Sequence, residues 1–250
     1  MNPVLSLVVP AYNEQDCIAG VLTELYSVLE QSGISFELIA VQNGSSDRTG
    51  EILDNLAEQY RHLRVLEISV NRGFGYGVIQ GLKECSAEIV GYMPGDGQIP
   101  PKTVPALVEK MRSQGAQLGK GCRVVRNDGL MRKIITVVYN VFIRMLFHLP
   151  TTDVNSNPKL MTLFAYKAIQ PSSHDFFIDP EILLKASKLG MKFCEVEVVS
   201  PKRDRGRSKL KVFRVGLDFA INLLKARFMK NDPWGIHAMP PARSMEYFER

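Results

Sequence analysis

The sequence predicts an α/β fold with a mostly parallel central sheet and helices on both faces, and three observations support this prediction. Strand-like apolar runs alternate with segments of helical periodicity through the first half of the chain. Each strand and its following helix have the length of a βα unit, and repeated units of this kind build a parallel sheet. An aspartate, Asp96, follows the fourth predicted strand on a turn rich in proline and glycine. Open α/β sheets bind ligands at such positions.

The first half of the chain divides into four predicted strands and the helices that follow them. We expect the strands at residues 4–9, 36–41, 64–68 and 88–93. The first helix, over 14–31, has apolar residues at helical spacing and ends at Gly33. Ser46 or Asp47 can cap the second helix. A fourth helix opens near Lys102.

The second half is less regular. We expect strands at 116–123, 159–163 and 192–199, and helices at 130–149, 180–189 and 211–230. The strand at 192–199 alternates like an edge or mixed strand, and the C-terminal helix at 211–230 is amphipathic. The chain is therefore expected to form one domain over residues 1–230, followed by a poorly ordered tail over 231–250.

Composition is that of an ordinary globular protein. Of the 250 residues, 45% are hydrophobic and 23% are charged, which fits one large domain with a substantial core. The four cysteines are scattered, which predicts reduced thiols in a cytosolic protein rather than a zinc site or a disulfide framework. We expect neither secretion nor a membrane span, because the N-terminus lacks a signal sequence and the apolar run 134–147 is too short.

The net charge of +5 is concentrated in one segment. Lysines and arginines crowd the stretch from Lys202 to Arg214, offset by Asp204. Such a segment can bind phosphate or an anionic lipid surface. It can also form a solvated charged face. Nucleic acid is not expected as a partner, because aromatic residues do not alternate with these cations.

The Gly-rich loop at residues 71–77 does not match a dinucleotide-binding fingerprint. Its glycines lack the spacing of that motif, and the loop follows the third strand rather than the first. The sequence also lacks a Walker-type phosphate loop. These observations disfavour a Rossmann dehydrogenase.

Several stretches resemble one family, and they occur in that family's order. They are VVPAYNE (8–14), VQNGSSDRT (41–49), Asn71-Arg72-Gly73, Asp96-Gly97-Gln98 with Pro100-Pro101, Gly121-Cys122-Arg123, Asp153 to Ser156 with Lys159, and RDRGRSK (203–209). Through this set the chain resembles family-2 inverting glycosyltransferases of the GT-A fold. The branch it resembles contains dolichol-phosphate mannose synthases and polyprenyl-phosphate glycosyltransferases. The resemblance extends from residue 4 to about residue 215.

The resemblance implies a role for each matching residue. For the nucleotide sugar it implies contacts from Pro10, Tyr12, Glu14, Gln42, Asn43, Asn71, Gly73 and Asp96. For the donor and acceptor phosphates it implies Arg123, Arg132, Lys159, Arg203, Ser208 and Lys209. It places a divalent metal, Mg²⁺ or Mn²⁺, on Asp96 and Gln98, and it assigns catalysis to Asp96 and Arg203. Without the resemblance, Asp96 could equally be a turn former between Gly95 and Gly97.

Two positions depart from the family pattern. Gln42 and Asn43 replace the paired acids after the second strand, and Pro94 replaces the first carboxylate of the Asp-x-Asp motif. Mg²⁺ commonly takes only one or two protein carboxylates and completes its shell with water and substrate phosphate, so Asp96 and Gln98 could suffice. The departures also leave open a different donor base, or a relative without catalytic activity.

The expected activity is inverting transfer of a sugar from a nucleotide-diphosphate sugar to polyprenyl phosphate at the cytoplasmic face of a membrane. A hydroxyl acceptor requires a general base, and Asp153 and Glu181 are the candidates. A phosphate acceptor is already ionised and requires only cations to position it. The apolar helix at 130–149 and the basic segment before the helix at 211–230 favour the lipid acceptor and peripheral attachment to the membrane.

Two alternatives stay open at this point. The chain could transfer sugar to a saccharide or protein hydroxyl, or it could bind a nucleotide sugar or lipid phosphate without catalysis. Residues 134–147 also fit a buried core helix, since valines and isoleucines occur on both of its faces. A separate membrane-anchoring partner is compatible with the absence of a predicted membrane span.

Overall fold

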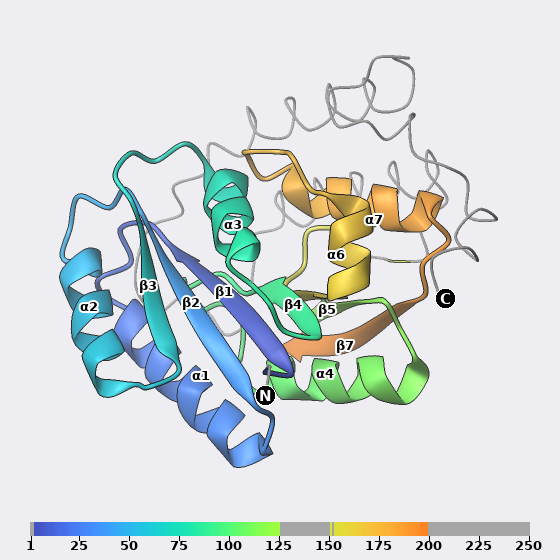
Figure 1. Cartoon of the computed structure of the whole chain (residues 1–250), viewed down its shortest axis with the longest axis horizontal. Coiled ribbons are helices and arrows are strands. Elements are labelled where there is room, and N and C mark those ends of the chain that lie inside the picture. The colour runs from blue at the N-terminus through green and yellow to red at the C-terminus, as the bar shows by residue number, and fades with distance from the viewer. Residues whose placement is uncertain (1–2, 126–150, 152, 200–250) are drawn as a thin grey trace.

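The computed structural model describes residues 3–125, 151 and 153–199. These residues form a seven-stranded sheet with helices on both faces (Figure 1). The strands lie in the order β3-β2-β1-β4-β6-β5-β7. Their bounds are β1 (Leu5–Ala11), β2 (Phe36–Asn43), β3 (Leu63–Ile68), β4 (Ile89–Tyr92), β5 (Leu118–Val125), β6 (Lys159–Thr162) and β7 (Phe193–Val199). The predicted α/β fold with a mostly parallel sheet is confirmed.

One strand, β6, runs against its neighbours. β1 pairs in parallel with β2 and β4, β2 with β3, and β5 with β7. β6 pairs antiparallel with both β4 and β5. The register places four polar residues in one row across β4, β6, β5 and β7: Tyr92, Lys159, Lys120 and Glu195. This polar row crosses the sheet at the level where β4 ends.

The helices form two layers, one on each face of the sheet. They are α1 (Ile18–Ser32), α2 (Thr49–Gln59), α3 (Phe74–Lys83), α4 (Thr103–Gln114), α6 (Leu163–Ile169) and α7 (Ile178–Lys188). α1, α2 and α4 cover one face, and α3, α6 and α7 cover the other (Figure 1). Side chains alternate along the central strand, so Leu7 and Val9 pack in the first layer and Val8 packs in the second. Burial of apolar surface on both faces stabilises the sheet.

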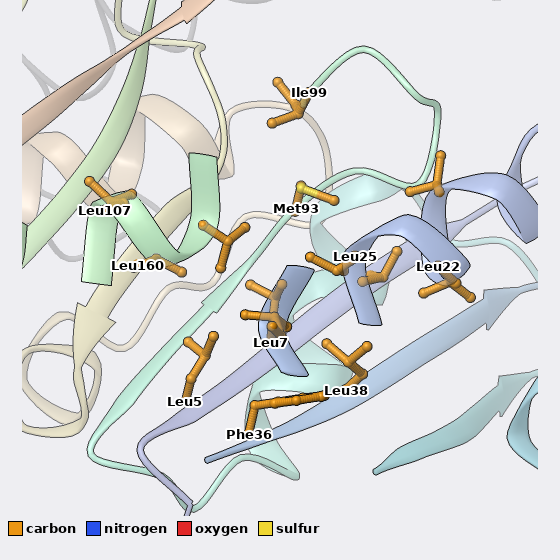
Figure 2. Close-up of a cluster of buried hydrophobic side chains, with 14 of the residues drawn as sticks. Leu5, Leu7, Leu22, Leu25, Phe36, Leu38, Met93, Ile99, Leu107 and Leu160 are labelled. Atoms are coloured by element: carbon orange, nitrogen blue, oxygen red, sulfur yellow. The ribbon is translucent and has the colours of Figure 1, made fainter. Parts of the chain in front are cut away.

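The core beneath α1 and α4 includes residues of the turn that contains Asp96. Figure 2 shows Leu22 and Leu25 of α1 in the same cluster as Leu7 of the sheet. Met93 and Ile99, at the two ends of the turn after β4, belong to this cluster as well. The turn is therefore anchored in the core on both sides.

Most predicted elements agree with the structure. The first helix ends at Gly33, which has the left-handed φ of 69° typical of a helix end. α3 begins at Phe74, inside the stretch expected to be a loop. α6 has no counterpart among the predicted elements, because its seven residues are too few for a periodic pattern. The helices predicted at 130–149 and 211–230 and the tail at 231–250 lie outside the described residues. Within the described ranges, no helix is long and apolar enough to cross a bilayer.

Candidate active site

The candidate site lies where the parallel strands β1, β2 and β4 end. Their last residues are Ala11, Asn43 and Tyr92, and β1 lies between the other two strands. Because the three strands run parallel, the loops that follow them start at the same edge of the sheet. Tyr12, directly after β1, is 38% exposed at this edge.

Hydrogen bonds join the loop after β1 to the loop after β2. The Asn13 side chain accepts a hydrogen bond from the Ser46 N–H at 2.8 Å, and the Asn13 N–H donates to Ser45 Oγ at 3.1 Å. Asn13 has a positive φ of 54°, which asparagine adopts more readily than most residues. The Glu14 N–H donates to Thr49 Oγ1 at 2.8 Å. These hydrogen bonds therefore hold the loop after β1 against the loop after β2.

The loop after β1 also contacts the turn that contains Asp96. The Gly95 N–H donates to the Pro10 carbonyl at 3.2 Å. Cys17 Sγ lies 3.4 Å from Glu14 Oε2 and 3.6 Å from the Gly95 carbonyl oxygen. Pro10 and Glu14, which the resemblance assigns to the nucleoside, thus lie next to the turn assigned to the metal.

The turn holds the Asp96 carboxylate at the end of β4. Asp96 is partly buried, and its Oδ1 accepts a hydrogen bond from the Gln98 N–H at 3.1 Å. Gly97 adopts a left-handed φ of 73° between them. Asp96 therefore does shape the turn. The same hydrogen bond fixes the direction of its carboxylate, so the two interpretations of this residue are compatible.

The two amides at the positions of the family's acids both make hydrogen bonds. Gln42 Oε1 accepts from the Gly44 N–H at 2.6 Å and the Ser45 N–H at 3.1 Å. Asn43 is buried, and its Nδ2 donates to the Gly73 carbonyl at 3.1 Å. The Asn43 Oδ1 is buried and finds no hydrogen-bond partner within the described part of the chain. Gln42 thus shapes the turn after β2, and Asn43 ties that strand to the start of α3.

Asn71 and Gly73 form the entry to α3. Asn71 Oδ1 accepts from the Gly73 N–H at 2.8 Å. A side-chain carbon at Gly73 would lie 2.3 Å from the His174 carbonyl oxygen. That carbonyl accepts a hydrogen bond from the Tyr76 N–H at 3.0 Å and so caps the first turn of α3. The glycines here permit close packing against the segment before α7.

Arg123 on β5 forms a two-pronged ion pair with Asp153. Arg123 Nε and Nη2 lie 2.8 Å from Asp153 Oδ2 and Oδ1, respectively. This geometry matches the planar guanidinium to both carboxylate oxygens. Asp153, one of the two candidate bases, is only 4% exposed.

Lys159 lies in the interior of the protein. Its ammonium is completely buried, 2.5 Å from Asp179 Oδ1 and 2.8 Å from the Ser156 carbonyl. The Tyr92 hydroxyl donates to the same Asp179 oxygen at 2.6 Å. Burial lowers the pKa of Lys159 to about 8, against the opposing effect of Asp179. Burial and the Asp179 charge raise the pKa of Tyr92. A buried and already paired ammonium does not suit the phosphate role that the resemblance implied, so we assign Lys159 to an internal polar network.

Glu181, the other candidate base, is also buried. It lies 2.7 Å from Lys185 Nζ, one helical turn along α7. Its carboxylate accepts hydrogen bonds from the Ser172 N–H at 2.9 Å and the Ser173 N–H at 2.8 Å. Glu181 therefore shapes the segment whose carbonyls cap α3.

The structure brings most of the predicted donor-site residues to one edge of the sheet. These residues are Pro10, Tyr12, Glu14, Gln42, Asn43, Asn71, Gly73, Asp96 and Gln98. Arg132, Arg203, Ser208 and Lys209 lie outside the described residues. Asp179 and Tyr92 are not among the predicted site residues. Asp179 is an acid in the first turn of a helix, a pattern that by itself indicates only a favourable interaction with the helix dipole.

Solved structures with a similar fold include glucosyl-3-phosphoglycerate synthase from Mycobacterium tuberculosis. The complex with Mn²⁺, uridine-diphosphate and phosphoglyceric acid matches with a TM-score of 0.73 and 22% identity, over 90% of this chain and 78% of that chain. The complex with Mg²⁺ and uridine-diphosphate matches with a TM-score of 0.69 and 20% identity, over 90% and 79%. The fold is thus the GT-A fold.

The chain belongs to glycosyl transferase family 2, whose model matches residues 6–169. An undecaprenyl-phosphate 4-deoxy-4-formamido-L-arabinose transferase from Edwardsiella ictaluri is 29% identical over 88% of this chain and 65% of its own length. A dolichyl-phosphate beta-glucosyltransferase from Trichomonas vaginalis is 29% identical over 93% and 76%. A dolichol-phosphate mannosyltransferase from Pyrococcus furiosus is 29% identical over 83% and 59%. Two of these three relatives are therefore matched over less than two thirds of their own length.

Proposed function

We propose that the chain is an inverting glycosyltransferase that moves a sugar from a nucleotide-diphosphate sugar to a polyprenyl phosphate. The observation that carries this choice of acceptor is the burial of both candidate bases. Asp153 is held by Arg123, and Glu181 is held by Lys185. A hydroxyl acceptor needs a general base within reach of its proton, whereas a phosphate acceptor does not. The names of the three relatives, each an undecaprenyl-phosphate or dolichol-phosphate enzyme, support the same choice.

The donor would lie across the loops that follow β1, β2 and β4, with its diphosphate near Asp96. A divalent ion fits here. Asp96 offers one carboxylate on an anchored turn, and Gln98 offers an amide oxygen two residues later. No cluster of three or more acidic, histidine or cysteine side chains exists in the described ranges to hold a metal without substrate. Mg²⁺ tolerates such a site because it retains water and takes phosphate oxygens as ligands. When bound, the metal would stabilise the negative charge that develops on the leaving diphosphate.

The acceptor side rests on residues from the second half of the chain. Arg123 lies on β5, and we assign Arg132, Arg203, Ser208 and Lys209 to the acceptor or donor phosphates from the sequence resemblance. We further propose peripheral attachment to the cytoplasmic face of a membrane. The basic segment from Lys202 to Arg214 and the apolar stretch at 130–149 support this, since cations and apolar surface together favour a membrane interface.

A transfer assay tests the proposed function. Purified chain is incubated with Mg²⁺ or Mn²⁺, a radiolabelled nucleotide sugar and a short-chain polyprenyl phosphate, and label in the organic phase is counted. We expect transfer with at least one common donor and its loss on addition of EDTA. Asp96→Asn should lower turnover by about a hundredfold or more, as expected when charge stabilisation in the transition state is removed.

The matched acceptor for this assay is the corresponding polyprenol without its phosphate. We expect no transfer to the alcohol, because the two candidate bases, Asp153 and Glu181, are buried and held in ion pairs. Transfer to the alcohol or to a soluble saccharide, with a pH profile that reveals an essential base, would instead establish a hydroxyl acceptor. Binding of nucleotide sugars without turnover would indicate a non-catalytic protein.

A further inference from the structure

The Asp179 carboxylate connects three segments beneath the candidate site. It lies in the first turn of α7 and is 4% exposed. Its Oδ1 accepts from the Tyr92 hydroxyl at 2.6 Å and from Lys159 Nζ at 2.5 Å. Its Oδ2 lies 3.5 Å from the Asn157 side-chain nitrogen. One side chain thus holds the end of β4, the start of β6 and the segment before β6.

Two of these segments, the end of β4 and the segment before β6, lead to a residue of the candidate site. Tyr92 is the last residue of β4 and precedes Asp96 by four positions. Asn157 follows Asp153, the partner of Arg123, by four positions. Asp179 is therefore a cross-link between the turn assigned to the donor diphosphate and the ion pair on the acceptor side.

Burying such a network in a protein interior carries a desolvation penalty. Three ionisable groups are withdrawn from water here, and Lys159 is completely buried. A buried ion pair often stabilises a fold no better than apolar side chains of similar size, while it specifies one arrangement of the groups that it joins. The surrounding side chains, including Phe177 and Ile178, form an apolar cluster that could accommodate an apolar residue at position 92.

We propose that Asp179, through the Tyr92 hydroxyl and the Lys159 ammonium, is a positioning residue that fixes the Asp96 turn relative to the Arg123–Asp153 pair. The proposal rests on the proposed function, because it assigns donor and acceptor sides to these two groups. Glycosyl transfer requires the acceptor oxygen to be aligned with the anomeric carbon and the leaving diphosphate. A displacement of about 1 Å at such a site can cost about a hundredfold in rate.

Tyr92→Phe is the test variant, because it removes one hydroxyl and retains the ring in its apolar surroundings. Tyr166→Phe is the matched control, since it removes the hydroxyl of a partly buried tyrosine on α6 that is not one of the three residues bound to Asp179. We expect Tyr92→Phe to lower kcat about tenfold or more while the KM for the donor stays within about twofold. Tyr166→Phe should change neither constant. Equal losses in both variants, or a loss in KM alone, would overturn the positioning role.

Amide hydrogen exchange provides a readout that does not depend on activity. In Tyr92→Phe we expect faster exchange at residues 93–99 and 153–158, with protection in β1 and α1 unchanged. Unchanged exchange in the two segments would refute the proposal even if activity fell. If the wild-type chain transfers no sugar, the proposed function fails, and exchange still decides whether Asp179 couples the segments. Asp179→Asn is the second variant, and it should accelerate exchange in the same two segments.

Discussion

At the scale of single residues, burial controls the ionisation of Cys85. This residue follows α3, and its thiol donates a weak hydrogen bond to the Gly81 carbonyl, with the sulfur 3.5 Å from the oxygen. Burial, reinforced by the charge of Glu37, raises the pKa of the Cys85 thiol from 9.0 to about 12. The folded protein therefore retains a proton at alkaline pH that the unfolded chain loses.

This difference predicts a loss of stability at alkaline pH. Above pH 9 the unfolded chain binds fewer protons than the folded protein, so the free energy of unfolding falls as pH rises toward 12. The slope from this one thiol is at most about 1.4 kcal/mol per pH unit.

Urea unfolding of wild type and Cys85→Ala at pH 8 and pH 10 measures this loss of stability. We expect the drop between the two pH values to be smaller in Cys85→Ala. Packing lost in the variant affects both pH values and so cancels in the comparison. An equal drop in both proteins would show that Cys85 does not ionise as described.

A sequence motif predicts where a residue lies in the fold better than it predicts which groups the side chain contacts. The sequence resemblance assigns Gln42 and Asn43 to the nucleotide sugar, and in the structure they are the last two residues of β2. It also assigns Lys159 to a phosphate, whereas the ammonium is buried against Asp179, twenty residues later in the chain. A lysine in a short motif looks the same whether it faces solvent or an internal carboxylate. The difference depends on a partner that only the tertiary fold brings close.

At the scale of elements, the start of α3 depends on glycines that allow backbone contact. A side-chain carbon at Gly75 would lie 2.1 Å from the Ser173 carbonyl oxygen and 2.6 Å from the Asp175 carbonyl oxygen. Both obstacles are backbone atoms, so a substitution would force α3 and the segment before α7 apart. Glu181 also holds this segment, through hydrogen bonds from the Ser172 and Ser173 N–H groups.

Gly75→Ala should therefore destabilise the protein, and Gly20→Ala is its matched control. We expect Gly75→Ala to cost about 1–3 kcal/mol, the usual range for overpacking a well-packed site. Gly20 lies on the exposed side of α1, with open space where its side chain would be. Alanine there should stabilise the helix by about 0.5–1 kcal/mol. Denaturant unfolding of both variants measures these opposite shifts. A neutral Gly75→Ala would mean that α3 is free to move away from residues 173–175.

The elements themselves are largely predictable because their patterns are local. Alternation and helical periodicity located β1 to β4 and the helices between them within a few residues. The short helix α6 was not predicted, because seven residues are too few to show helical periodicity. Its one local signal is the side-chain cap from Thr162. The antiparallel direction of β6 could not be predicted either, because the sequence pattern of a four-residue strand is the same for a parallel and an antiparallel strand.

At the scale of the whole molecule, the strand order determines where the site forms. β1 lies between β2 and β4, so the loops after three parallel strands meet at one edge. The antiparallel β6 then begins beside the end of β4, since Lys159 pairs with Tyr92 in the sheet. The start of β6 thus brings the Asp153 segment to the same end of the sheet as Asp96. This arrangement brings residues more than fifty positions apart in the sequence to the same end of the sheet.

A ligand bound at this edge contacts several loops of one domain and should stabilise the whole fold. At a concentration a hundred times its dissociation constant, a ligand adds about 2.7 kcal/mol to the free energy of unfolding. For a domain of this size, that corresponds to a rise in Tm of about 5–10 °C. We expect such a rise with UDP or GDP in the presence of Mn²⁺, and a smaller one in EDTA.

Asp96→Asn should lose the metal-dependent part of the shift, because its carboxylate is the one acid on the turn. Asp54→Asn, which changes an exposed acid on α2, should retain the full shift. If Asp96→Asn retains the metal-dependent shift, the metal is held elsewhere, and Asp96 serves the turn alone.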